Sequence, residues 1–403
     1  MPSQQLTLLC VGLWLVRILA ATNRTICFHG NGAGDRGTAV ATFDYAHYAQ
    51  KLYGHKSIIF FPDYVETFYK QHHGAHSSLQ KFSDNFEVVI YKPRGEGTAN
   101  KFGTPALMDA AVASQCDVMY IIKDGAIDHS PTPSTWRHCP QVCTVVHGVF
   151  FYQPHGDVFA SIHTSIKNSN GPTKAVPHMV VPPPDVPSPT NYKEEFGIPK
   201  SALVVCRHGG ATTFDIKQAH QAVIKSVGMF TSDQLHYIFL NTDHFLDAAK
   251  YPKRIHFLPS TSSSVLKEKY FQSCDAMLHA RSDGETFGLA VAEFSVRNKP
   301  VLTTESGENS RTHVAILGDA AYLWQPNDGM LLKHIQSMID NGIPEKNYNR
   351  YADYYPEPVM KQFEDIFVQP CVDILKNRLP DPKQCKVGGV IHWPLDMKRL
   401  GGV

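Results

Sequence analysis

Two glutamates separated by seven residues, Glu285 and Glu293, are the residues best suited to chemistry in this sequence. Gly288 lies between them, and free backbone N–H groups near Gly288 and Leu289, at the start of a helix, could hold a phosphate. Glu293 follows Gly288 by five residues, roughly 7–8 Å along a helix axis, which suits the ribose of a bound nucleotide. Two acids beside a phosphate would repel it, so we expect both carboxylates to face hydroxyl groups.

The chain around these glutamates predicts a strand, a loop, a helix and a second strand in succession. An apolar run at 276–280 indicates a buried strand, residues 288–296 indicate a helix that Asn298-Lys299-Pro300 ends, and 301–304 indicate the next strand. Units of this kind build parallel sheets. We therefore expect both glutamates at one edge of an α/β sheet.

This stretch resembles the Glu-x7-Glu signature of retaining, group 1 glycosyltransferases with the GT-B fold, and the match continues through Phe287-Gly288-Leu289. The resemblance implies two doubly wound Rossmann-like α/β domains facing a cleft, with a C-terminal helix returning to the first domain. It also implies transfer of a sugar from a nucleotide-diphosphate sugar to an acceptor hydroxyl, with retention. Glu285 would meet the transferred sugar, Glu293 the ribose, and Phe287, Gly288 and Leu289 the donor. Neither a metal nor a cofactor other than the donor is then expected.

Arg207 is a further candidate, because it ends a strand predicted at 203–206. A guanidinium forms paired, charge-assisted hydrogen bonds with a diphosphate. The family has an arginine at this place, usually followed several residues later by a phosphate-binding lysine, but residues 211–215 contain no lysine. Either Lys217 or the backbone N–H groups of Gly209 and Gly210 would take that role.

A glycine-rich loop follows the first predicted strand. Gly32-x-Gly34-x-x-Gly37 fits the dinucleotide fingerprint, with Asp63 after the second strand, and leaves an NAD-dependent enzyme or a nucleotide-sugar epimerase as alternatives. In the family this loop faces the cleft, so Gly34, Arg36 and Gly37 would help to place the sugar, the donor phosphate or the acceptor. A tight turn without a binding role is the other interpretation.

His147 lies near the carboxyl end of the strand predicted at 143–149, at the edge where open α/β sheets bind ligands. It matches a Val-His position of the family that lies close to the sugar. A catalytic role and a structural role both remain open for it. A third alternative for the whole chain is a non-catalytic nucleotide-sugar-binding protein.

Strands alternate with helices on both sides of the proline-rich stretch at 176–189, which indicates a doubly wound domain on each side. First-half strands are expected at 26–29, 57–61, 86–91, 118–122, 143–149 and 158–162, and second-half strands at 203–206, 237–240 and 255–259. The expected domains are a signal peptide or anchor (1–21), an acceptor-side domain (22–178), a hinge (179–190), a donor-binding domain (191–355), a crossover helix (356–378) and a tail (379–403).

Composition excludes some partners. The 403 residues carry a net charge of +1, which gives no reason to expect nucleic acid. An apolar run at 6–16 resembles a secretory signal, which places the protein in the ER or Golgi lumen or outside the cell, with an uncleaved membrane anchor as the rival and a cytoplasmic location otherwise. Asn23-Arg24-Thr25 is a glycosylation sequon. Eight cysteines besides Cys10 permit disulfides and equally suit buried thiols. The acceptor, whether glycan, lipid or protein, stays open.

Overall fold

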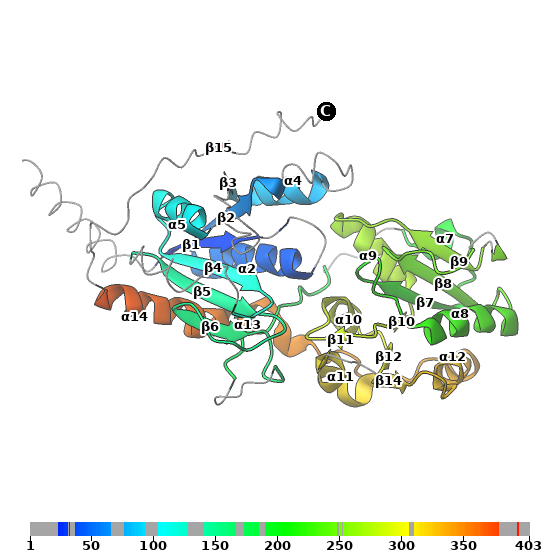
Figure 1. The fold of residues 1–403 in the computed structure, drawn as a ribbon. Helices are drawn as coiled ribbons and strands as arrows, with labels where there is room; N and C mark the ends of the chain where they lie inside the picture. Colours follow the sequence, from blue (N-terminus) through cyan, green and yellow to red (C-terminus); the bar gives the residue numbers. More distant parts are fainter. Residues whose placement is uncertain are drawn as a thin grey trace, which may run out of the picture. The chain divides into compact units, whose positions relative to one another are not determined.

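The computed structural model describes residues 23–30, 32, 37–65, 76–92, 104–127, 141–166, 173–184, 190–247, 250–251, 253–305, 310–378 and 393–394 (Figure 1). Its contacts divide the chain into two compact units. Unit 1 comprises Met1–Pro177 and Pro356–Val403, and unit 2 comprises His178–Tyr355. The predicted segment 1–21 lies outside the described residues, as does part of the predicted hinge, 185–189.

Unit 1 is built on a seven-stranded sheet in the order β15-β3-β2-β1-β4-β5-β6. Its strands are β1 (Thr25–His29), β2 (Lys56–Pro62), β3 (Glu87–Tyr91), β4 (Val118–Lys123), β5 (Cys143–Gly148), β6 (Val158–Ser161) and β15 (Trp393–Pro394). All neighbouring strands are parallel except β15, which pairs antiparallel with β3. The parallel strands are nearly continuous apolar runs because helices cover both faces of the sheet.

The two faces of this sheet are covered by different helices: α2 (Gly37–Tyr53), α4 (His76–Asn85), α5 (Thr104–Ala113), α13 (Pro356–Phe363) and α14 (Gln369–Asn377), with a π-helical turn, η5 (Glu364–Val368), between the last two. On one face α5 packs against alternate strand residues such as Cys27 and Met119. On the other, Phe363 of α13 stacks on Phe28 and on Tyr45 of α2. The predicted return of the C-terminal helix to the first domain is confirmed.

Unit 2 contains a six-stranded parallel sheet in the order β14-β12-β10-β7-β8-β9. Its strands are β7 (Leu203–His208), β8 (Leu235–Leu240), β9 (Ile255–Leu258), β10 (Ala276–Leu278), β12 (Val301–Thr304) and β14 (Ala321–Trp324). The helices are α7 (Tyr192–Glu195), α8 (Lys217–Met229), α9 (Ser264–Ser273), α10 (Leu289–Ser295), α11 (Thr312–Leu317) and α12 (Met330–Asn341), with short 3-10 turns η3 (Gly318–Ala320) and η4 (Ala352–Tyr354). A small second sheet pairs β11 (Gly284–Glu285) with β13 (Ser310–Arg311) and was not predicted.

The prediction of two doubly wound α/β domains is confirmed. Within the described residues, no helix is both long and apolar enough to span a membrane. Three disulfides form among these residues, Cys27–Cys116, Cys143–Cys371 and Cys206–Cys274. The first two hold unit 1 together and the third lies within unit 2.

Candidate active site

Glu285 lies on β11, and its carboxylate is held by two positively charged or polar neighbours. Its Oε1 lies 3.4 Å from Nε2 of His279, and its Oε2 accepts a hydrogen bond of 3.0 Å from Nη1 of Arg281. Burial alone would raise the pKa of Glu285, but the hydrogen bond from His279 and the charge of Arg281 outweigh burial and lower the pKa below its usual value. Glu285 is therefore an ionised, oriented acceptor.

Gly288 connects β11 to α10 with a backbone that requires glycine. Its φ is +82°, and an added Cβ would lie 3.3 Å from Cβ of both Glu285 and His313. Leu289 begins α10 directly after it, one residue later than predicted. Phe287 is buried, stands edge-on to Tyr351 and Tyr354, and accepts a 2.7 Å hydrogen bond at its carbonyl from the Tyr351 hydroxyl. Phe287 thus anchors this loop in the core.

Glu293 lies on α10 between a lysine and a histidine that the sequence did not single out. Nζ of Lys267, on α9, donates a 2.7 Å hydrogen bond to Oε1 of Glu293, and Nε2 of His208 lies 2.6 Å from Oε2. Burial would raise the pKa of Glu293, but Lys267 and His208 lower it strongly. This carboxylate is ionised as well, with its orientation fixed from α9 and from the end of β7.

Arg207 is almost fully buried, and its guanidinium joins two loops. Nη1 donates to the Asn241 carbonyl at 2.9 Å and to the Thr242 hydroxyl at 2.6 Å. Nη2 donates to the Gly210 carbonyl at 2.7 Å and to the Thr213 hydroxyl at 2.8 Å. These four bonds fasten the loop after β7 to the loop after β8. A direct bond from these nitrogens to a phosphate would have to share or replace one of them.

The other predicted phosphate partners lie near this loop. Gly209 and Gly210 belong to it, and Gly209 has a φ of +153°, which a side chain would disfavour. Lys217 is exposed at the first turn of α8. No contact ties Lys217 to the two glutamates, so its role stays a prediction.

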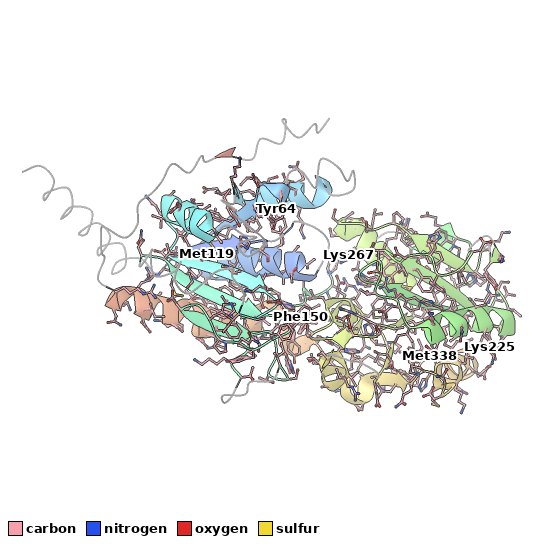
Figure 2. The ribbon with its side chains drawn as sticks, viewed as in Figure 1. Tyr64, Met119, Phe150, Lys225, Lys267 and Met338 are labelled. Carbon is pink, nitrogen blue, oxygen red and sulfur yellow. A yellow bond between two sulfur atoms is a disulfide. The ribbon has the colours of Figure 1, made fainter. Side chains whose placement is uncertain are left out.

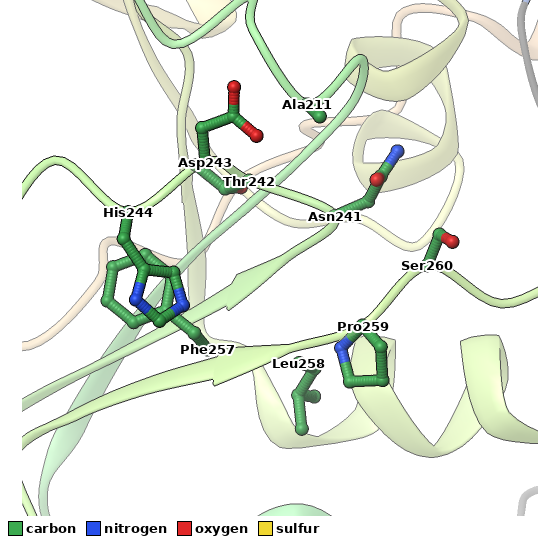
Figure 3. Close-up of a pocket in the computed structure, with 9 residues that line it drawn as sticks. All are labelled: Ala211, Asn241, Thr242, Asp243, His244, Phe257, Leu258, Pro259 and Ser260. Carbon is green, nitrogen blue, oxygen red and sulfur yellow. The ribbon is translucent and has the colours of Figure 1, made fainter.

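The loops that Arg207 joins line a cavity of about 340 Å³ at the carboxyl edge of β7, β8 and β9. Its walls are Ala211, residues 241–244 and residues 257–260. Figure 3 shows the imidazole of His244 over the ring of Phe257, with ring centres 4.1 Å apart, while the Asp243 carboxylate points away from this pair. The cavity therefore offers an aromatic wall with hydroxyl, amide and carboxylate groups around it.

His147 lies in unit 1 and is completely buried. Its Nε2 donates a 2.7 Å hydrogen bond to the Val176 carbonyl, so its Nδ1 accepts the 2.6 Å bond from the Tyr120 hydroxyl. A bond from His147 to a substrate would require one of these to break. Its visible role is to hold the chain where it leaves unit 1.

The glycine-rich loop is described only in part. Gly37 is the exposed first residue of α2, and Gly32 is also described, whereas Gly34 and Arg36 lie outside the described residues. The functions predicted for Gly34, Arg36 and Gly37 stay predictions. Among the residues the structure describes, no three His, Cys, Asp or Glu side chains are grouped so that they could hold a metal ion.

The residues missed from sequence are the partners of the two glutamates: His208, Lys267, His279 and Arg281. His208 directly follows Arg207, and Arg281 precedes Glu285 by four residues. Lys267, by contrast, sits inside a helix whose spacing gives no signal, 26 residues before its partner. Only packing reveals it.

Residues 241–354 match the family Glycosyl transferases group 1, a range that contains Glu285, Glu293 and most of the cavity wall. No protein of curated function matches the sequence significantly. Among solved structures, Anabaena Alr3699/HepE in complex with UDP and glucose aligns with a TM-score of 0.57 and 14% identity, over 86% of this chain and 100% of that chain. A glycosyltransferase from Rickettsia africae ESF-5 aligns with a TM-score of 0.55 and 12% identity, over 89% and 100%.

A structure described as trehalose-6-phosphate from E. coli bound with UDP-2-fluoro glucose aligns with a TM-score of 0.54 and 10% identity, over 89% of this chain and 100% of that chain. At these identities the alignments establish the fold. The chain has the GT-B fold of these glycosyltransferases, and its residues 241–354 match the Glycosyl transferases group 1 family.

Proposed function

We propose that this protein is a hexosyl-type glycosyltransferase that moves a sugar from a nucleotide-diphosphate sugar to an acceptor hydroxyl, with retention of the anomeric configuration. One observation carries the proposal. Glu285 and Glu293 are both held as oriented carboxylates on either side of Gly288, within the part of unit 2 that matches the family. Oriented acceptors at a sheet edge suit a ligand rich in hydroxyl groups.

The roles follow from position. Glu293 accepts from the ribose and Glu285 from the transferred sugar. The N–H groups of Gly288 and Leu289 meet the diphosphate, assisted by Lys217 or by the Gly209 and Gly210 amides. These donors stabilise the charge that develops on the leaving phosphate, so the proposed reaction needs no metal.

The cavity beside Arg207 suits the nucleobase. An aromatic wall formed by His244 and Phe257 can stack on a base, and the surrounding polar groups can meet its edge. Arg207 serves this site by fixing the two loops that form its walls. UDP is bound by the Anabaena protein, so uridine nucleotides are the first ligands to test.

The test is a thermal-shift screen of the full chain against UDP, GDP, ADP and their sugar conjugates. We expect one nucleotide to raise the melting temperature, and Glu293→Ala to lose most of that shift. Glu345→Ala, which removes an exposed acid of the same unit, is the matched control. An unchanged shift in Glu293→Ala would contradict the ribose assignment.

Turnover separates the remaining alternatives. Release of the free nucleotide with transfer of the sugar supports the transferase, whereas binding without turnover favours a non-catalytic binding protein. Titration with NAD, followed by its own fluorescence, tests a dinucleotide enzyme that uses the loop around Gly37. An epimerase would instead return the sugar nucleotide intact with an altered sugar.

We also propose that the protein folds in the secretory pathway, which the three disulfides support because such bonds are rare in the cytosol. The sequon at Asn23 would then be available for a glycan. Removal of N-linked glycans should shift the electrophoretic mobility of wild type but not of Asn23→Gln. Free thiols at all six cysteines of the secreted protein would contradict this location.

A further inference from the structure

A buried row of hydrogen-bonding side chains lies behind Glu285. From Glu285 it runs to His279 after β10, where Nδ1 lies 2.9 Å from Oγ1 of Thr303 on β12. The same oxygen lies 3.0 Å from Nε2 of His313 on α11. His279, Thr303 and His313 are 6%, 0% and 1% exposed, so water does not replace any link in the row.

The number of protons limits how this row can be arranged. The Glu285 carboxylate only accepts, so Nε2 of His279 must carry a proton. The Thr303 hydroxyl has one proton, so it donates to one imidazole and accepts from the other. In the first arrangement His313 donates to Thr303 and Thr303 donates to Nδ1 of His279. In the reversed arrangement Nδ1 of His279 donates to Thr303 and Thr303 donates to His313, so His279 carries protons on both nitrogens.

His313 distinguishes the two arrangements. The reversed order would put its proton on Nδ1, which is buried and makes no hydrogen bond of normal geometry. An unsatisfied buried N–H costs about 1–3 kcal/mol. Burial lowers the pKa of His313 to about 3, which keeps this imidazole neutral, with a single proton on one of its two nitrogens. Since Nδ1 has no hydrogen-bond partner, this single proton is favoured on Nε2 of His313.

We propose that the row is a directional relay in which His313 donates to Thr303, Thr303 to His279, and Nε2 of His279 to Glu285. His279 is then a positioning residue. It holds one oxygen of Glu285 while Arg281 holds the other, and this leaves Glu285 able only to accept hydrogen bonds from the hydroxyls of the transferred sugar. The identity of that ligand rests on the proposed function, but the direction of the relay does not.

Thr303→Val tests the relay because it keeps the shape of the side chain and removes its hydroxyl. His279 then loses the donor that keeps its Nδ1 unprotonated. The tautomer with a lone pair on Nε2, facing the carboxylate, becomes accessible. Glu285 would lose its fixed orientation without any change in the nucleotide contacts made by Glu293.

The first measurement is 15N NMR of the histidine-labelled full chain, with His279→Asn and His313→Asn to assign the signals. We expect Nε2 protonated and Nδ1 unprotonated in both residues of the wild type, and an altered His279 signal in Thr303→Val. Two protonated nitrogens on His279, or a proton on Nδ1 of His313, would overturn the directional relay.

The second measurement uses UDP-glucose as the probe donor and UDP as the probe nucleotide. For Thr303→Val we expect kcat to fall about fivefold to tenfold with UDP affinity within about twofold of wild type. His279→Gln, which keeps an N–H donor, should retain more activity than His279→Leu. Thr42→Val is the matched control, because Thr42 is equally buried in unit 1.

Equal losses of kcat and UDP affinity in Thr303→Val would overturn the positioning role, and so would an unchanged kcat. If wild type does not turn over UDP-glucose, the proposed function fails for that donor. The tautomers measured by NMR still decide the relay in that case, because they do not depend on activity.

Discussion

Replacing Lys267 by glutamine removes the positively charged partner of Glu293 and leaves His208 as its other partner. Nζ of Lys267 and Oε1 of Glu293 are 2.7 Å apart, and their side chains are 29% and 24% exposed. Two unit charges about 4 Å apart attract by about 4 kcal/mol at an effective dielectric constant of about 20. Partial exposure and the desolvation of the lysine offset part of this attraction. We therefore expect Lys267→Gln to lose about 2 kcal/mol of folding stability.

This loss should be visible as a lower melting temperature. For a unit of this size, 1 kcal/mol corresponds to about 2–4 °C, so Lys267→Gln should melt about 4–8 °C below wild type at pH 7. Lys225→Gln is the control. Lys225 is exposed on α8, on the opposite side of unit 2 from Lys267 (Figure 2), and its replacement should change the melting temperature by less than about 1 °C.

The pH dependence provides a sharper check. The pKa of Glu293 is lower in the folded than in the unfolded protein, so its stabilising contribution is present above the unfolded pKa of about 4.3 and is lost as the pH falls through the folded value. Without Lys267 the folded pKa rises toward the unfolded one. The difference in melting temperature between wild type and Lys267→Gln should thus be fully present at pH 7 and should shrink as the pH falls below about 4. No difference at pH 7, or one that grows on acidification, would refute the reasoning.

Three further outcomes are expected. Gly288→Ala should cost about 1–3 kcal/mol in chemical denaturation, because of its positive φ and close neighbours, whereas Gly228→Ala, a helical position with open space, should be neutral or stabilising by up to about 1 kcal/mol; equal effects would contradict the packing. Arg207→Lys keeps the charge but loses the guanidinium hydrogen bonds that connect the two loops, so the melting temperature and its increase on adding UDP should both become smaller. An unchanged increase on adding UDP would exclude the bracing role. Peptide mass spectrometry without reduction should recover Cys206 linked to Cys274, and replacing both by serine should cost about 2–5 kcal/mol.

Much of the fold could be predicted because local patterns and packing agree. The apolar runs at 118–122 and 301–304 become β4 and β12, and the helix expected at 288–296 becomes α10 (Leu289–Ser295). Strands buried on both faces must be apolar along their whole length, and that composition is readable without a structure. The two-residue strands β11 and β13 left no such pattern, because their pairing depends on contacts between distant segments.

The same limit applies to the site. Glu285, Gly288 and Glu293 stand out by spacing, since a turn with a glycine between two acids is a local feature. Their partners do not. Thr303 and His313 approach Glu285 from separate elements, and nothing in their sequence neighbourhood marks them.

Sequence alone therefore determined the alternation of strands and helices and the acids beside the turn, because each depends on residues close together in the chain. The tertiary structure decided which side chains keep those acids ionised and oriented. It also placed His147 in the core and turned Arg207 toward two loops. Charge and hydrogen bonding act over a few ångströms in space, and only the folded chain brings Lys267, His208 and His279 within that distance of the glutamates.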